Sequence, residues 1–248
     1  MKVLGIDIGG TGIKAAIVDT KTGELITERH RIPTPKPALP KSVSKVIKEM
    51  VNHFDWKGTV GCCFPTIVVD GVCKHPGNLH SDWVNVKIDK LFKKECGNTF
   101  YVSNDADLAG FSEIKFGAGK KVKGKVIVVT IGTGIGSGLF YNGKLIPNVE
   151  LGRILHTNGE IIELNCSDSA RKRDELSLSE WAKRFDFFLN YVKVLHTPSL
   201  FILGGGISKK FDRFKEHLTV EVPVEVAKFK NNAGIIGAAI FAEKNHKK

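Results

Sequence analysis

Residues 2–19 read KVLGIDIGGTGIKAAIVD, two apolar stretches on either side of a glycine-rich turn. Both stretches are short and contain several Val and Ile residues, a composition typical of β-strands. The turn at 9–12 has little side-chain bulk over its backbone N–H groups, an arrangement that suits phosphate oxygens. Asp7 stands where the first strand ends. The segment therefore predicts a strand, a phosphate-binding turn and a second strand, with a carboxylate beside the turn.

The rest of the first half alternates predicted strands and helices. Residues 41–54 carry apolar side chains at helical spacing, with lysines on the other face. The strand at 99–103 ends in Asn104-Asp105, a pair that also fits a strand-to-helix N-cap. We further predict a strand at 23–32, a buried strand at 59–64, an extended pair at 67–69 and 72, and a short helix at 88–95.

The second half repeats the outline of the first. A helix at 107–116 leads to a strand at 125–131, a glycine turn at 132–136 and a strand at 137–141. Asn142-Gly143 predicts a hairpin, and Ser177 with Glu180 predicts a capping box that starts a long helix. A strand at 200–203 ends in three glycines, and residues 233–239 open a terminal helix. The polar segment 157–175 gives no assignable pattern.

Composition limits the cellular setting and the partners. The chain has 248 residues, 42% of them hydrophobic, and no apolar run near the roughly 20 residues that cross a bilayer. We see no export leader and expect a cytoplasmic protein without a membrane partner. Five cysteines without a C-x-x-C pair indicate idle thiols. The formal charge of +11 favours polyanionic partners, although a solvated lysine-rich surface explains it as well.

Three strand ends are followed by glycine turns, at 9–12, 132–136 and 204–206. One such turn alone is usually a hairpin, but three together indicate a site for phosphate groups. Thr11 and Thr133 add hydroxyl donors. An acid such as Asp7 beside a phosphate loop makes chemical sense when a divalent cation, Mg²⁺, lies between them.

These motifs resemble a known family. The segment GIDIGGTGIK at 5–14 resembles the first phosphate motif of the ROK family of sugar kinases, within the actin/hexokinase superfamily, and GTGIGS at 132–137 resembles the second. The chain length, the Gly-Ile-Lys ending of the first motif and GKLIPNVE at 143–150 resemble the polyphosphate-dependent glucokinase branch. Further matches follow in family order at Asn78-Leu79 with Trp83, at 104–107, at 204–208 and at 233–239.

The resemblance implies an α/β chain with the two-lobed actin-like/ribonuclease-H-like ATPase fold and a central cleft. Residues 1–106 would form the N-terminal lobe and 107–234 the C-terminal lobe, with the terminal helix 235–248 packing back on the first. It also implies a homodimer whose substrates are a small-molecule sugar and a polyphosphate or nucleotide.

The resemblance also implies a mechanism. Asp105 would be the catalytic base that deprotonates the 6-hydroxyl of glucose or a related hexose. Asp7 would place Mg²⁺, directly or through water. The sugar would be bound by Asn78, Asn104, Asp105, Glu150 and Arg153. The donor phosphates would be bound by Asp7, Gly9, Gly10, Thr11, Gly12, Lys14, Gly132, Thr133, Gly134, Gly205 and Gly206.

The chain departs from the family pattern at three places. Arg153 replaces a histidine that contacts the sugar, and His156 could substitute for it only if the loop takes another path. Arginine donates hydrogen bonds but does not accept them, so the sugar preference is open. The zinc-binding cysteines of many family members are absent, so no zinc is expected. Pro65-Thr66 replaces the family's Pro-Gly and would narrow the sugar entrance.

Several alternatives remain. The donor is polyphosphate, ATP or both, and lysines such as those at 120, 121, 123 and 125 would line a track for a polyanion or form an ordinary solvated surface. An ATP-only ROK hexokinase for mannose or N-acetylmannosamine is one alternative, and a catalytically impaired sugar sensor is another. Repressors of the family carry a helix-turn-helix ahead of the first motif. Here that motif begins at residue 5, so no DNA partner is expected.

Overall fold

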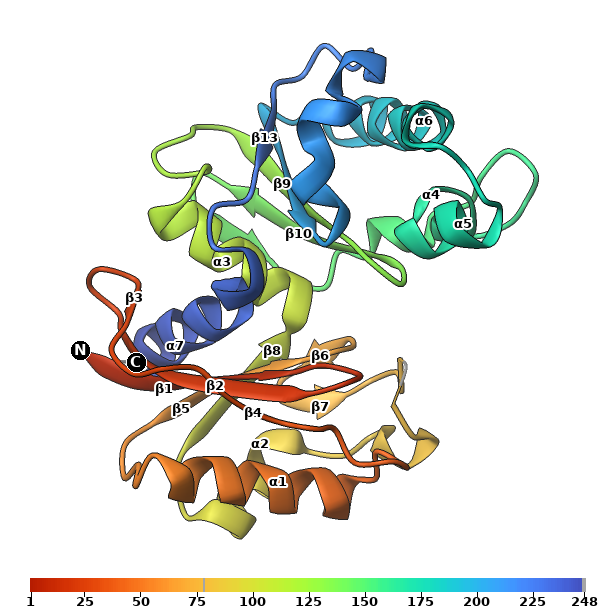
Figure 1. Ribbon diagram of the computed structural model, residues 1–248. Coiled ribbons are helices and arrows are strands. Elements are labelled where there is room, and N and C mark those ends of the chain that lie inside the picture. The colour runs from red at the N-terminus through yellow and green to blue at the C-terminus, as the bar shows by residue number, and fades with distance from the viewer. Residues whose placement is uncertain (78, 247–248) are drawn as a thin grey trace. The chain divides into compact units, whose positions relative to one another are not determined.

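The structure is a computed structural model that describes residues 1–77 and 79–246. It divides into two compact units. Unit 1 comprises Met1–Ser112 and Asn232–Lys248, and unit 2 comprises Glu113–Asn231. Each unit is built on its own twisted sheet (Figure 1).

The sheet of unit 1 starts from the predicted strand, turn and strand, β1 (Lys2–Ile8) and β2 (Ile13–Asp19), which pair antiparallel. Its order is β3-β2-β1-β5-β8, with β4 also paired to β2. β5 runs parallel to β1, and β8 runs parallel to β5. The other strands are β3 (Glu24–Leu25), β4 (His30–Ile32), β5 (Val60–Phe64) and β8 (Phe100–Asn104).

The single strand predicted at 23–32 is wrong, because β3 and β4 are separate. The segment between β3 and β4 forms hydrogen bonds with both the backbone N–H and the backbone carbonyl of Ile17 in β2. The Ile26 N–H donates to the Ile17 carbonyl at 2.7 Å, and the Ile17 N–H donates to the Thr27 hydroxyl at 3.0 Å. A side-chain oxygen therefore replaces a backbone acceptor, and the regular ladder stops there.

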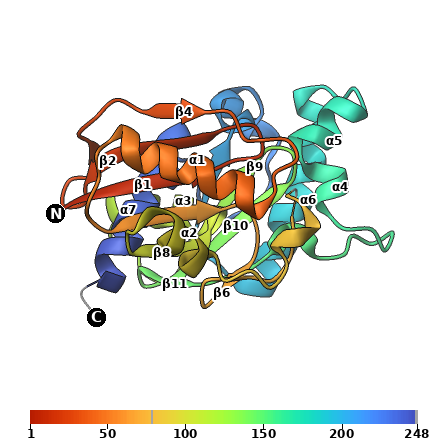
Figure 2. The ribbon, with the colours of Figure 1, turned by 90° about the horizontal axis from the view of Figure 1, so that it is seen from below.

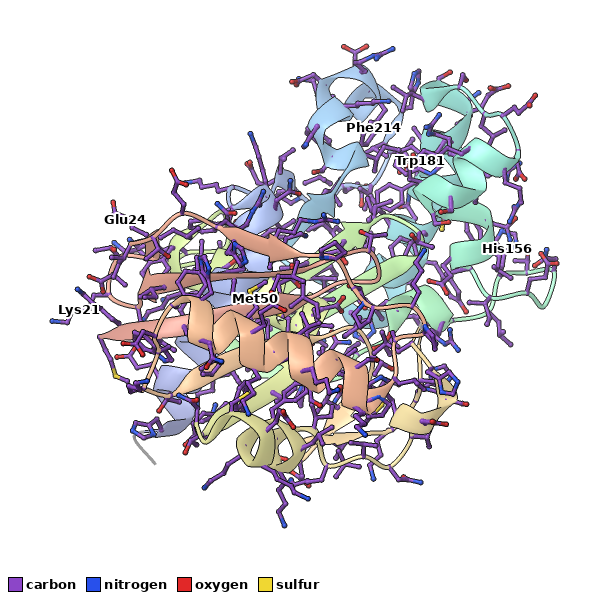
Figure 3. The ribbon with its side chains drawn as sticks, turned by 60° about the horizontal axis from the view of Figure 1, so that its bottom comes forward. Lys21, Glu24, Met50, His156, Trp181 and Phe214 are labelled. Carbon is purple, nitrogen blue, oxygen red and sulfur yellow. The ribbon has the colours of Figure 1, made fainter. Side chains whose placement is uncertain are left out.

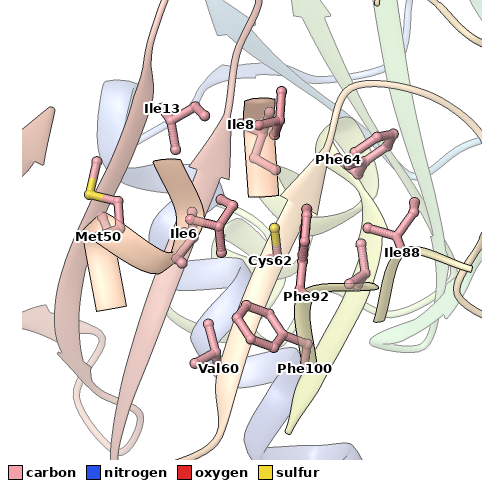
Figure 4. Packing of buried hydrophobic residues seen from close by; sticks show 14 of the residues in the cluster. Ile6, Ile8, Ile13, Met50, Val60, Cys62, Phe64, Ile88, Phe92 and Phe100 are labelled. Atoms are coloured by element: carbon pink, nitrogen blue, oxygen red, sulfur yellow. The ribbon is translucent and has the colours of Figure 1, made fainter. Parts of the chain in front are cut away.

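Alternate residues of β1 serve two different faces. Ile6 and Ile8 face a core covered by α1 (Pro40–His53) and α2 (Ile88–Cys96), where Met50 and Phe92 are fully buried (Figures 2 and 4). The opposite face is covered by α7 (Ala233–His246) (Figure 1). The period-two pattern of the sequence thus separates an aliphatic face from the face that carries Asp7.

Glycines let α7 lie directly on backbone. An added Cβ would come within 2.1 Å of the Ile235 carbonyl oxygen from Gly5, and within 1.9 Å of the Ala238 carbonyl oxygen from Gly61. From Gly237 it would come within 1.6 Å of the Leu108 carbonyl oxygen in α3 (Asp105–Phe116). No side chain fits at these crossings, so the close approach requires glycine.

Gly237→Ala is therefore expected to lower the free energy of unfolding by about 1–3 kcal/mol, because the helix must move off α3 to admit the methyl group. Urea denaturation followed by circular dichroism measures the loss. The matched control for stability is Gly10→Ala, whose added methyl would meet nothing within 4 Å. If both variants unfold at the same urea concentration as the parent protein, the tight crossing at Gly237 is not a constraint.

Unit 2 has the same strand order as unit 1, and it begins with the predicted strand, glycine turn and strand. Its sheet runs β11-β10-β9-β12-β13, with β9 and β10 antiparallel and β9 and β12 parallel. Asn142 and Gly143 both have positive φ and form the predicted hairpin turn between β10 and β11. The strands are β9 (Lys125–Ile131), β10 (Ile135–Tyr141), β11 (Lys144–Ile146), β12 (Leu200–Gly205) and β13 (Val224–Val226).

The long helix α6 (Leu178–His196) starts at the predicted capping box, in which Ser177 and Glu180 bond reciprocally. Its apolar face covers the β9, β10 and β12 strands, and its Trp181 meets Phe214 edge to face at 5.0 Å (Figure 3). The unassigned segment at 157–175 contains two short helices, α4 (Glu163–Cys166) and α5 (Asp168–Arg173), the second capped by Ser167.

The remaining elements are short. β6 (Val68–Val69) and β7 (Val72–Cys73) form the predicted extended pair. Turns of 3₁₀ helix lie at Ser81–Trp83, Leu151–Arg153, Ile207–Arg213, Lys215–His217 and Lys230–Asn232. Within the described residues, no helix combines the length and the apolar character needed to cross a bilayer.

Candidate functional site

The carboxyl ends of the parallel strands in unit 1 bring Asp7 and Asp105 to one edge of the sheet. Asp7 lies opposite Cys63 of β5, and Asp105 directly follows β8. The buried Cys63 thiol lies near both carboxylates. Burial, and then the negative charges of Asp7 and Asp105, raise the pKa of Cys63 well above its usual range. Ligand sites of open α/β sheets commonly form at such an edge.

Asp7 is held between β2 and the start of α7. Its Oδ2 lies 3.7 Å from the Lys14 Nζ, and its side chain is 20% exposed. A Cβ added to Gly234 would come within 3.1 Å of the Asp7 Cγ, so the carboxylate sits against the first turn of α7. Burial raises the pKa of Asp7 above its ordinary value, while the charge and hydrogen bond of Lys14 lower it in part.

The first glycine turn is held through its carbonyl oxygens. The Gly9 N–H donates to the Gly12 carbonyl at 3.1 Å, the Thr34 hydroxyl donates to the Gly9 carbonyl at 2.5 Å, and the Arg31 Nη2 donates to the Thr11 carbonyl at 2.8 Å. Gly10 and Thr11 are exposed. The Gly9 N–H is used within the turn, so an anion would be bound by the N–H groups of the exposed residues Gly10 and Thr11.

Asn104 and Asp105 lie at the junction of β8 and α3. The Asn104 Oδ1 accepts from the Asp107 N–H at 3.0 Å, and its Nδ2 donates to the Thr66 carbonyl at 3.2 Å. Asn104 thus caps α3 as the alternative interpretation of this pair suggested, and it is almost fully buried. The half-buried Asp105 accepts from the Ala106 N–H at 2.8 Å, which orients its carboxylate.

Thr66, at the family's glycine position, donates its hydroxyl to the His75 carbonyl at 2.6 Å and is 7% exposed. Its side chain is therefore part of the loop's own scaffold. The predicted sugar ligand Asn78 lies outside the described residues.

Unit 2 places its two glycine turns side by side at the carboxyl ends of β9 and β12. Gly205 pairs with Ile131 and has φ +84°, and a Cβ there would come within 2.1 Å of the Ile131 carbonyl oxygen. The Gly132 N–H donates to the Gly134 carbonyl at 3.0 Å. Four residues of these turns lie exposed along this edge: Gly132, Thr133, Gly205 and Gly206.

Ser137, the last residue of the second phosphate motif, fixes the chain around Glu150. Its hydroxyl donates to the Val149 carbonyl and accepts from the Leu151 N–H at 2.9 Å. A Cβ on Gly152 would come within 2.2 Å of the Ile135 carbonyl oxygen, so this segment lies directly on β10. Glu150 is thereby positioned beside the second phosphate motif.

Glu163 is a site residue that sequence reasoning missed. Its Oε2 accepts from the Ile135 N–H at 2.9 Å, and its Oε1 lies 3.7 Å from the Arg153 Nη1. A Cβ on Gly134 would come within 2.4 Å of Oε2, so only glycine leaves room for this carboxylate. Glu163 thus links the second phosphate turn to Arg153. It lies in the polar segment 157–175, where no spacing or motif marked it.

His156 and Arg153 contact different partners in the structure. The His156 ring, labelled in Figure 3, packs against Phe187 of α6 with 4.8 Å between ring centroids, while the Arg153 Nη1 lies 3.7 Å from the Glu163 Oε1.

Within the described residues, no group of three His, Cys, Asp or Glu side chains is arranged to hold a metal ion. Asp7 is a single carboxylate beside a phosphate turn. Mg²⁺ is usually bound by one or two carboxylates together with substrate phosphates, so the Asp7 environment fits that ion.

Comparisons with known proteins agree with this geometry. A polyphosphate glucokinase of Mycobacterium tuberculosis (strain CDC 1551 / Oshkosh) is 41% identical over 237 residues, which cover 95% of this chain and 89% of that protein. The crystal structure of an inorganic polyphosphate/ATP-glucomannokinase from Arthrobacter sp. strain KM has a TM-score of 0.93 and 43% identity, covering 99% of each chain.

A ROK family glucokinase from Streptomyces griseus, solved with glucose and AMPPNP, shares the fold with a TM-score of 0.83 at 23% identity, covering 98% of this chain and all of that one. These neighbours confirm the predicted actin-like ATPase fold. The ROK family profile matches residues 3–167, and together with the relatives above it shows that this chain belongs to the ROK family.

Proposed function

We propose that the chain is a hexokinase-type kinase that transfers a phosphoryl group from polyphosphate, ATP or both to the 6-hydroxyl of glucose or a related hexose. The observation that carries the proposal is the edge of the unit 1 sheet, where Asp105 lies with Asp7 and the first glycine turn. Relatives named for this reaction match nearly the whole chain at 41% and 43% identity.

Asp105 acts as the general base in this proposal. It accepts the proton of the sugar hydroxyl as that oxygen attacks the terminal phosphorus of the donor. The hydrogen bond from the Ala106 N–H holds the carboxylate in a fixed orientation, and Asn104 fixes the start of the helix that carries it. Glu150, Arg153, Asn78 and Asn104 would bind the other sugar hydroxyls.

The glycine turns bind the donor phosphates through backbone N–H groups, and Lys14 adds positive charge beside the first turn. Asp7 would hold Mg²⁺, which would neutralise charge on the phosphoryl oxygens. Glu163 keeps the second turn in shape through the Ile135 N–H. Most of the rate enhancement then comes from positioning and charge neutralisation.

A substrate panel tests the proposal. Glucose, mannose, glucosamine and N-acetylmannosamine are each offered with ATP or polyphosphate, and the sugar phosphates are measured by mass spectrometry. We expect glucose 6-phosphate with polyphosphate as donor. Activity with ATP alone would remove the polyphosphate assignment and leave the kinase. Sugar binding without turnover on any donor would favour the sensor alternative.

The expected homodimer and cytoplasmic location belong to the same proposal. Light scattering after size-exclusion chromatography measures the mass of the particle, and a value near 27.2 kDa would contradict the dimer.

A further inference from the structure

Three charged residues form a row across neighbouring strands of unit 1. Asp7 in β1 pairs with Lys14 in β2, and Lys14 pairs with Arg31 in β4. Directly opposed residues of a sheet project from the same face, so the three side chains share the face that carries the first phosphate turn. The row contains one negatively charged side chain, Asp7, and two positively charged ones, Lys14 and Arg31.

Arg31 lies against the first glycine turn. Its Nη2 donates to the Thr11 carbonyl at 2.8 Å. A Cβ added to Gly12 would come within 2.5 Å of the Arg31 Nε and 2.7 Å of its Cζ, so only glycine lets the guanidinium lie over the turn. This is a specific placement for a side chain that is otherwise exposed.

The charge of Arg31 has no counterion within the described part of the chain. Lys14 is paired with Asp7, whereas no ion pair involves Arg31 there. Like charges directly opposite each other on adjacent strands destabilise a sheet, so the Lys14 and Arg31 pair carries an electrostatic cost. An anion bound beside both side chains relieves that cost.

We propose that Arg31 binds a phosphate group of the donor other than the one transferred, beside the first turn. The inference rests on the proposed kinase function and adds a donor-binding residue to it. One N–H of the guanidinium is used by Thr11, and the planar fork presents four further N–H donors that match phosphate oxygens.

A purely structural role is a weaker account, because the turn already has a neutral clamp. The Thr34 hydroxyl holds the Gly9 carbonyl, which is the same kind of bond that Arg31 makes to Thr11. Holding a carbonyl needs a donor but not a charge. An anionic ligand explains why the second clamp is a cation.

The first test variant is Arg31→Gln, which removes the charge and keeps a shorter side chain that ends in an amide; Thr34→Val, described below, controls for the shape of the turn. Its KM for tripolyphosphate is expected to rise about tenfold or more, while its KM for glucose changes less than about twofold. The logarithm of the donor KM should also depend less steeply on the logarithm of salt concentration, because one cation-phosphate contact is lost. The matched control is Lys45→Gln, on the exposed side of α1, which should change neither constant.

Binding without turnover gives an independent readout. Isothermal titration of tripolyphosphate into the sugar-free protein should show the same loss of about tenfold or more in Arg31→Gln, and a smaller loss in Arg31→Lys, which keeps the charge but not the fork. Unchanged affinity in folded Arg31→Gln would overturn the inference. So would a Thr34→Val variant that reproduces the whole effect, because turn shape would then suffice. If tripolyphosphate binding depends on Arg31 but the protein has no kinase activity, only the proposed function is refuted, and the inference about Arg31 stands.

Discussion

Asp105→Asn is expected to lower kcat for sugar phosphorylation by about 10²- to 10⁴-fold, the usual contribution of a positioned general base. Asparagine has nearly the same shape, and its side-chain oxygen can still accept from the Ala106 N–H. The start of α3 should therefore survive the change. What is lost is the carboxylate that takes the proton, so kcat should fall much more than the affinity for sugar.

Steady-state kinetics at saturating donor measures the effect, and calorimetric titration of glucose measures the affinity. Asp55→Asn is a matched control in the same unit, because Asp55 is 86% exposed in the loop after α1. It should keep the parent kcat. An Asp105→Asn enzyme with parental turnover would remove the proposed base, whatever the behaviour of the control.

Asp7→Asn is expected to reduce kcat by about 10²- to 10³-fold and at the same time to stabilise the folded protein at neutral pH. The loss of rate follows from removing a charge that organises the donor and its cation. The gain in stability follows from burial, which raises the pKa of Asp7 in the folded state above its value in the unfolded chain. Ionised Asp7 therefore costs folding free energy that asparagine does not.

The sign of the effect depends on pH. A raised folded-state pKa gives stability that is fully present below the ordinary pKa of 3.8 and is lost as pH rises through the folded-state pKa. The Tm of Asp7→Asn should thus exceed that of the parent at pH 7, and the difference should shrink as pH falls toward 4. Thermal unfolding across that range measures it. A variant less stable than the parent at pH 7 would show that the Lys14 ion pair outweighs the burial cost.

Most of the strand and helix pattern could be predicted, because it follows from local chemistry. The strand, turn and strand at 2–19, the Asn142-Gly143 hairpin and the capping box at Ser177 each depend on residues that are close in sequence. The repeated start of the two halves, a strand, a glycine turn and a second strand, could be predicted for the same reason.

Features that depend on contacts between distant segments could not be predicted. The break between β3 and β4 depends on the hydrogen bonds that Ile26 and Thr27 make with the backbone of Ile17. The link between Glu163 and the second turn joins residues that are 28 positions apart, in a segment without a motif. Arg31 looked like an ordinary strand residue until its register with Lys14 was known. The roles of the predicted sugar and phosphate ligands stay predictions until they are tested by mutation.

The helix that closes unit 1, α7, follows the whole of unit 2 in the sequence. About 120 residues separate Ser112 from Asn232, so the ribosome makes the whole of unit 2 before α7 emerges. Ribosomes add about 5–20 residues per second, so the delay lasts for seconds. Until then the glycine-lined face of the β1 and β5 strands stays bare. The second unit can complete its core before α7 is made, whereas the first cannot finish until α7 has been synthesised.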